Sequence, residues 1–132
     1  MKSNVAIAFL YMLVATFVYA NEALAEIKEN CQKKWKTDYK MIKYCYDEQV
    51  NAYGMVANMN QDEILSSCNK RWGKDYKMVV FCTNQQRSSK KQLAQASDKE
   101  ILNDCQNKWR TDYKMIKFCY DQQTEAKKSL GI

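Results

Sequence analysis

The chain has 132 residues and a formal net charge of +6, with three glycines, no proline and no histidine. That length suffices for one small domain, and the abundance of Lys, Glu, Gln, Ala and Met predicts an all-α protein. Without histidine the chain lacks the commonest general base and the Ser-His and Cys-His pairs, and it contains no glycine-rich phosphate loop. We therefore expect no enzyme activity, no catalytic residues and no cofactor.

Residues 1–20 have the pattern of a secretory signal peptide. Lys2 gives a positive start, an apolar run covers residues 5–19, and small residues follow at Ala20 and Ala25. The run is shorter than the ~20 residues of a membrane-spanning helix, so a cleaved leader is favoured over a membrane anchor. We expect cleavage after Ala20 or as late as after Ala25. The mature protein would be secreted or periplasmic, with no transmembrane span.

A period of 37 residues runs through the rest of the chain. Each period contains the pattern Cys-x3-Trp-x2-Asp-Tyr-x-Met-x3-Cys, as in the segment CQKKWKTDYKMIKYC. The repeat divides the chain after the leader into modules over residues 21–58, 59–95 and 96–132. It places the cysteines as Cys31 and Cys45, Cys68 and Cys82, Cys105 and Cys119.

Each module has the sequence of two helices joined by a short turn. Ile, Cys and Trp recur at four-residue spacing on the first helix, which ends just after Trp. Asn60 and Ser97, each followed by a Glu three residues on, are predicted to begin the first helices of the second and third modules. An Asp caps each second helix. These second helices are predicted to run from Asp38 towards Ala57, from Asp75 towards Gln95, and from Asp112 towards Lys128.

The position of the cysteines within the two helices predicts their pairing. In antiparallel helices both cysteines of a module lie roughly 9 to 11 Å from the turn, at about 1.5 Å per residue. They are therefore level, which favours the bridges 31–45, 68–82 and 105–119. The leader predicts an oxidising compartment, where such cysteines form disulfides rather than metal sites. No Pro or Gly cluster separates the modules. We therefore predict three tandem disulfide-stapled helical hairpins, stacked as a short solenoid-like array.

The repeated motif resembles units found in uncharacterised exported bacterial proteins, and the resemblance covers residues 26–126. It implies helical-hairpin modules and export, and it carries no known activity. The twin-cysteine hairpins of mitochondrial intermembrane proteins are similar in plan. They differ in using a shorter cysteine spacing and a second bridge in each hairpin.

Basic residues concentrate around the predicted turns, and this is where we expect binding. Hairpins stacked in register would align the turns as one positive edge, suited to an anionic polymer of the cell envelope. The alternative is a solvated face with cations placed favourably near helix C-termini. Loss of Lys2 with the leader leaves a net charge of +5, which is too small to favour nucleic acid. The candidate binding residues are Lys36, Lys40, Lys74, Lys77, Arg110 and Lys114.

Two further motifs have a structural and a functional interpretation. Each module's Trp could stack on a sugar or base, but packing over the disulfide and Tyr is favoured. Met41 and Cys45 could hold Cu(I), but Met at helical spacing is typical of a core, so no metal site is predicted. The favoured function is a binding or scaffold module of the cell envelope, contacting a protein or an anionic polymer. The alternatives are a secreted effector or inhibitor and, third, a copper carrier.

Overall fold

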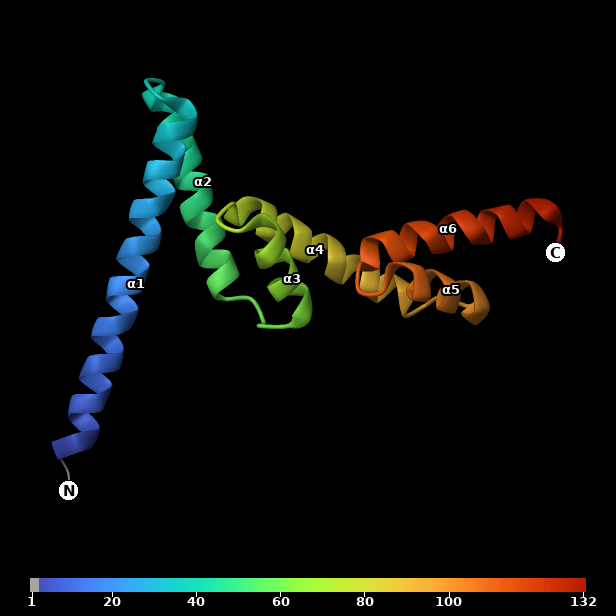
Figure 1. Ribbon diagram of the computed structural model, residues 1–132, viewed down its shortest axis with the longest axis horizontal. Helices are drawn as coiled ribbons and strands as arrows, with labels where there is room; N and C mark the ends of the chain where they lie inside the picture. Colours follow the sequence, from blue (N-terminus) through green and yellow to red (C-terminus); the bar gives the residue numbers. More distant parts are fainter. Residues whose placement is uncertain (1–2) are drawn as a thin grey trace. The chain divides into compact units, whose positions relative to one another are not determined.

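The computed structural model describes residues 3–132, with side chains from Val18 onward. These residues form helices and no strand, so the all-α prediction is confirmed (Figure 1). Successive helices pack in pairs as three hairpins: α1 with α2, α3 with α4, and α5 with α6. The helices are α1 (Ser3–Trp35), α2 (Tyr39–Ala57), α3 (Glu63–Trp72), α4 (Tyr76–Leu93), α5 (Lys99–Trp109) and α6 (Tyr113–Leu130).

The same tight turn joins the two helices of every hairpin. In the first hairpin the amide of Lys36 donates to the carbonyl of Gln32 at 2.7 Å, and the amide of Asp38 donates to the carbonyl of Trp35 at 2.9 Å. The second hairpin repeats both bonds at 2.8 and 3.1 Å, and the third repeats them at 2.7 and 3.1 Å. The 37-residue sequence repeat is therefore also a repeat of backbone structure.

An aspartate caps the second helix of each hairpin, as predicted. The carboxylate of Asp38 accepts a hydrogen bond from the amide of Met41 at 3.1 Å. Asp75 and Asp112 accept from the equivalent amides at 3.3 and 3.2 Å. Each carboxylate satisfies an amide that has no partner within the helix.

The helices α3 and α5 begin near Asn60 and Ser97 as predicted, but the prediction that these two residues cap them was wrong. Asp62 and Asp98 are the capping residues, and each accepts from the amide three residues on, at 2.8 and 3.1 Å. A carboxylate carries a full charge at the positive end of the helix, so it is favoured there over the neutral side chains of Asn60 and Ser97.

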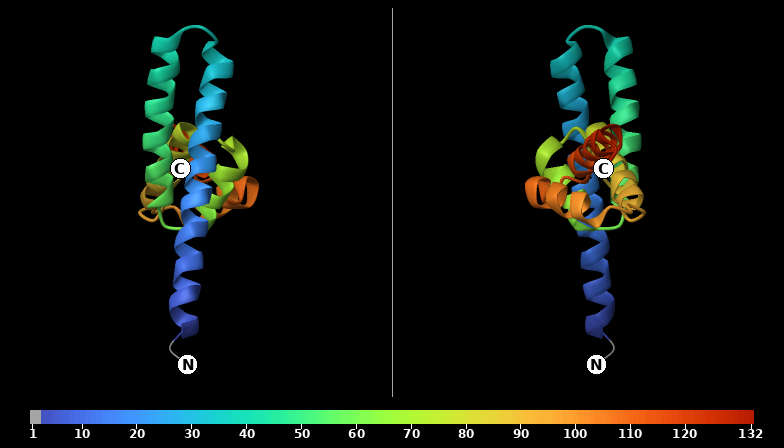
Figure 2. Two further views of the ribbon diagram at one scale, coloured as in Figure 1. Left: turned by 90° about the vertical axis from the view of Figure 1, so that its left-hand side faces the viewer. Right: turned by 90° about the vertical axis from the view of Figure 1, so that its right-hand side faces the viewer.

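The predicted disulfides are confirmed. Cys31 bonds Cys45, Cys68 bonds Cys82, and Cys105 bonds Cys119, with Cα atoms 5.8, 5.8 and 5.7 Å apart. The first cysteine of each pair is buried between the helices. Figure 2 shows α1 and α2 side by side and joined by a short turn, which is the geometry that makes the two cysteines level.

The chain divides into two compact units, Met1–Asn58 and Met59–Ile132. The first unit contains the α1–α2 hairpin, whose buried apolar residues include Ile27, Ile42 and Ala52. The second unit contains the α3–α4 and α5–α6 hairpins, and α4 packs on α6. The predicted stacking is thus confirmed for the second and third hairpins.

Leu93, the last residue of α4, lies in the core of the third hairpin rather than the second. It forms a buried cluster with Cys105 and Ile116. Trp109 and Tyr113 pack against this cluster, so the packing interpretation of the tryptophan holds for the third hairpin. The two halves of α4 therefore serve different hairpins. Its first half carries the bridge to α3, and its second half packs on the next hairpin.

The predicted signal peptide begins at Met1 and Lys2, which lie outside the described residues. From Ser3 the backbone is helical without interruption to Trp35. Within the described part of the chain, no helix combines the length and the apolar character needed to cross a membrane. The leader and its cleavage after Ala20 or Ala25 stay predictions.

Candidate functional site

The six candidate binding residues are all exposed and lie at the turns of the hairpins. We call them the basic tips. Lys36 and Arg110 directly follow the last residue of a first helix, and Lys74 lies one residue later in the second hairpin. The other three occupy the first turn of a second helix. They are Lys40 in α2, Lys77 in α4 and Lys114 in α6.

Two of the basic tips have a backbone conformation that favours glycine. Lys36 has φ +52° and Arg110 has φ +54°, while Gly73, at the same position of the repeat, has φ +55°. A side chain at positive φ costs roughly 1 kcal/mol or more. In the second hairpin glycine takes this position, and the basic residue, Lys74, follows it. The other two hairpins carry a basic side chain where the backbone disfavours any side chain.

The first-turn lysines are also placed against local stability. A cation near a helix N-terminus opposes the helix dipole, which costs a few tenths of a kcal/mol. The capping carboxylates of Asp38, Asp75 and Asp112 offset part of this cost, but α2, α4 and α6 have no further acidic residue in their first turn. By contrast α3 and α5 carry Glu63 and Glu100 there. Favourable charge placement near helix C-termini therefore does not account for Lys40, Lys77 and Lys114.

An exposed aromatic residue stands beside the second cysteine of each hairpin. Tyr44, Phe81 and Phe118 are each more than half exposed. These three aromatic residues were not among the predicted site residues. The signal was their position two residues after a buried aliphatic residue such as Ile42. At about 100° per residue, that turns the aromatic to the opposite face of the helix.

A groove of about 100 Å³ on the second unit combines aromatic and basic groups. Trp72 and Phe81 of the second hairpin line it, together with Arg71 and with Lys114 of the third hairpin. Lys114 is a predicted site residue. Arg71 and Phe81 were not in the predicted set, and for Trp72 packing was favoured over ligand stacking. Trp72 is more than one-third exposed, so the packing interpretation is incomplete for this tryptophan. The groove offers cations and an apolar surface to one ligand.

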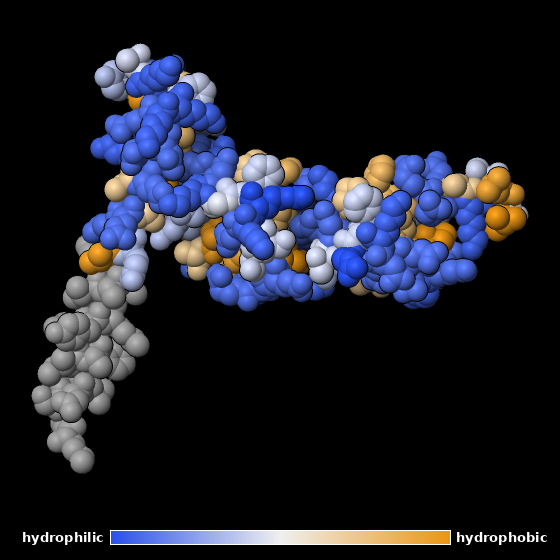
Figure 3. All heavy atoms as spheres, in the orientation of Figure 1, coloured by the Kyte–Doolittle hydropathy of each residue, from blue (hydrophilic) through white to orange (hydrophobic). Residues whose placement is uncertain are grey.

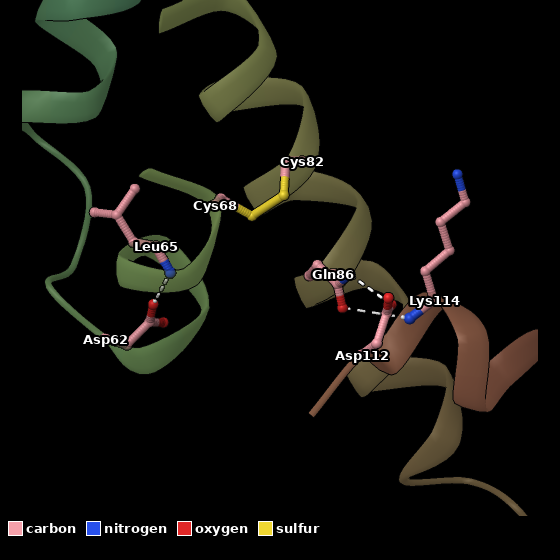
Figure 4. Close-up of a disulfide and its surroundings, with 7 residues drawn as sticks. All are labelled: Asp62, Leu65, Cys68, Cys82, Gln86, Asp112 and Lys114. Carbon is pink, nitrogen blue, oxygen red and sulfur yellow. Dashed lines mark hydrogen bonds between the residues drawn. A yellow bond between two sulfur atoms is a disulfide. The ribbon is translucent and has the colours of Figure 1, made fainter. Parts of the chain in front are cut away.

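Gln86 of α4 fixes the third hairpin beside this groove (Figure 4). Its Nε2 donates to Oδ1 of Asp112 at 2.8 Å, and its Oε1 accepts from the amide of Lys114 at 3.3 Å. The ammonium of Lys90, one turn further on, lies 5.2 Å from the centre of the Tyr113 ring. The turn between α5 and α6 thus contacts the middle of α4, which Figure 1 shows.

The second and third hairpins are therefore staggered rather than in register. Gln86 lies ten residues beyond Tyr76, the first residue of α4, so the two turns are offset by roughly 15 Å at about 1.5 Å per residue. A single continuous edge of aligned turns does not form between these hairpins. Instead, the start of α6 brings Lys114 alongside Arg71 across the groove.

The capping carboxylates at the starts of α3 and α5 have lowered pKa values. The ammonium of Lys127 donates to Asp98 at 2.8 Å and holds the pKa of Asp98 below its usual range. The pKa of Asp62 is lowered by the amide of Leu65 and also by the guanidinium of Arg87, 2.9 Å away. Arg87 and Lys127 thus pair with the capping carboxylates of first helices and are not part of the basic tips.

The cysteines are engaged in structure rather than in metal binding. All six form disulfides, so Met41 has no thiolate beside it at Cys45 to complete a soft-metal site. Among the residues that the structure describes, no group of three or more His, Cys, Asp or Glu side chains is placed to hold a metal ion.

Comparison with known proteins identifies no family for this chain. No family model matches it, and neither a curated protein nor a solved structure does. The structure contains the disulfide-stapled helical hairpins that the sequence motif implied, and no family or relative is identified.

Proposed function

We propose that this chain is an exported, non-enzymatic repeat protein that binds an anionic polymer of the cell envelope through its basic tips. The observation that carries the proposal is the backbone conformation of Lys36 and Arg110. Retaining a basic side chain where glycine is favoured lowers stability, and such local cost is typical of functional positions. Lys40, Lys77 and Lys114 support the same inference, because they too are placed against the helix dipole.

Other features support the compartment and the kind of ligand. Three disulfides in so small a protein are typical of folding outside the reducing cytoplasm, in agreement with the predicted leader and a secreted or periplasmic location. The groove beside Lys114 adds the aromatic surfaces of Trp72 and Phe81 to the cations. It suits a ligand that combines negative charge with apolar or sugar surfaces. An envelope protein with an acidic face is the second candidate partner.

The proposal is tested by titrating the mature oxidised protein with dextran sulfate, using neutral dextran of equal length as the ligand control. Changing Lys36, Lys74 and Arg110 together to Gln should lower affinity for the sulfated polymer about tenfold. It should also flatten the dependence of log K on log salt by roughly two to three, because fewer counterions are released. Isothermal titration at several salt concentrations measures both quantities.

A matched control separates the tips from overall charge. Lys91, Lys99 and Lys128 are also exposed, and changing them to Gln removes the same charge away from the tips. We expect a much smaller loss of affinity in this variant. Equal losses in the two triple variants would mean that the polymer senses net charge alone, and the proposed site would be wrong. Binding confined to an acidic envelope protein would favour the second candidate partner.

A further inference from the structure

The end of α6 repeats a surface that is already in use at the end of α4. Leu93 and Leu130 occupy the same position of the 37-residue repeat, and each is the last residue of its helix. Leu93 is 5% exposed in the core of the third hairpin, whereas Leu130 is 71% exposed. Gln123 on α6 likewise repeats Gln86, and it is exposed. We call Gln123 and Leu130 the docking face of α6. Figure 3 shows hydrophobic residues gathered at that end of the helix.

The first hairpin has a groove at the position where the third hairpin binds Leu93. An apolar groove of about 250 Å³ lies on it, lined by Lys28, Tyr39, Ile42, Lys43 and Tyr46. At the same repeat positions, the third hairpin presents Leu102, Tyr113, Ile116 and Tyr120, which belong to or pack against the cluster around Leu93. The groove of the first hairpin therefore corresponds to the site that Leu93 fills in the third.

Exposure confirms that this groove is open. Tyr39 is 77% exposed, while Tyr113 at the equivalent position is partly buried against the core cluster. Ile42 retains 9% exposure, while its equivalent Ile116 has none. A leucine side chain placed between these residues would bury apolar surface from both partners, as Leu93 does within the second unit.

The polar half of the contact is also preformed. In the second unit, Gln86 bonds Oδ1 of Asp112 and the amide of Lys114. Asp38 caps α2 in the same way as Asp112 caps α6, with its Oδ1 3.1 Å from the amide of Met41. The carboxylate of Asp38 and the amide of Lys40 thus offer Gln123 the same acceptor and donor.

We propose that a second copy of this chain is the occupant, and that the docking face of α6 binds the groove of the first hairpin in another molecule. The contact repeats the packing of α4 on the third hairpin, so it continues an interface that the protein already makes. Because the two surfaces are different, the contact is head-to-tail, and repetition yields chains or rings rather than a closed two-fold dimer. Lys28 replaces Leu102 at one wall, which makes this contact weaker than its counterpart within the molecule. The inference does not depend on the basic tips.

Sedimentation velocity of the mature oxidised protein over a wide concentration range tests the contact. The average mass should rise with concentration. Leu130→Glu should weaken association roughly tenfold or more, since a leucine would no longer be buried. Ile132→Glu is the matched control. Ile132 is also exposed at the end of the chain, but its repeat equivalent is the exposed Gln95. A monomer at every concentration, or equal effects of the two variants, would overturn the proposal.

Mixing two defective variants tests the head-to-tail geometry. Leu130→Glu keeps the groove and loses the docking face. Tyr39→Glu keeps the docking face and loses the groove. At a concentration where the unaltered protein just associates, each variant alone should be monomeric, and an equimolar mixture should form a one-to-one complex and nothing larger. Circular dichroism of each variant checks that it stays helical. We expect it to, because Leu130 and Tyr39 are both exposed and their replacement leaves the core unchanged. A mixture that stays monomeric while the unaltered protein associates would rule out this contact.

Discussion

At the scale of single residues, the turns place basic side chains at a backbone conformation that destabilises any residue other than glycine. Lys36, Gly73 and Arg110 share one backbone conformation, and only glycine adopts it without strain. For Gly73 and Arg110 the ψ angles are −113° and −97°. With φ near +55°, these angles place the residue at the first central position of a type II′ turn, which is a glycine position.

Lys36→Gly and Arg110→Gly should therefore each stabilise the protein by about 1 kcal/mol. Gly73→Ala should destabilise it by a similar amount. Lys36→Gln is the control for charge, because it removes the cation and keeps the side chain, and it should leave stability nearly unchanged. Denaturant unfolding measures all four. A loss of stability in Lys36→Gly would show that the side chain at this turn contributes more than the backbone strain costs.

Some residue roles were predictable from local sequence and others were not. Asp38 was predicted as a cap because it directly follows the turn. The predicted capping roles of Asn60 and Ser97 were wrong, and Asp62 and Asp98, which cap instead, also have partners far away in the chain. Arg87 binds Asp62 across 25 residues, and Lys127 binds Asp98 across 29. A capping pattern four residues long contains neither partner.

At the scale of helices, the repeat predicted the hairpins and their bridges, because equal distances from the turn make the cysteines level. It did not predict the stagger between the second and third hairpins. The stagger depends on where Leu93 and Gln86 reach the next hairpin. The 37-residue repeat places Leu93 and Gln86 on α4, but it does not predict which face of α4 packs on which hairpin.

Gln86→Ala should cost about 1 kcal/mol, because Asp112 and the amide of Lys114 each lose a hydrogen bond at the start of α6. Gln123→Ala is the matched control. Gln123 is at the equivalent position of α6, its side chain is exposed, and it should contribute little to the stability of a monomer. Thermal unfolding at low protein concentration compares the two. Equal shifts in Tm would mean that Gln86 does not hold the third hairpin in place.

At the scale of the whole molecule, the second unit should unfold as one cooperative body. The second and third hairpins share α4, whose first half is bridged to α3 and whose last residue is buried in the third hairpin. In a stack of this kind, stability passes between neighbours through their interface. A solenoid-like array likewise requires neighbouring hairpins to stabilise each other. Hydrogen exchange can therefore distinguish stacked hairpins, which open together, from independent hairpins, which open separately.

Changing Cys68 and Cys82 together to Ala should lower the stability of the second unit by about 3 kcal/mol, the chain-entropy value for a loop of roughly fifteen residues. Amide exchange should then accelerate in α5 and α6 as well as in α3 and α4, because Leu93 and Gln86 couple α4 to the third hairpin. Adding Leu93→Ala should weaken that coupling, so that loss of the bridge has a smaller effect on α5 and α6. Faster exchange confined to α3 and α4 in the first variant would contradict the shared helix and leave two hairpins that are merely adjacent.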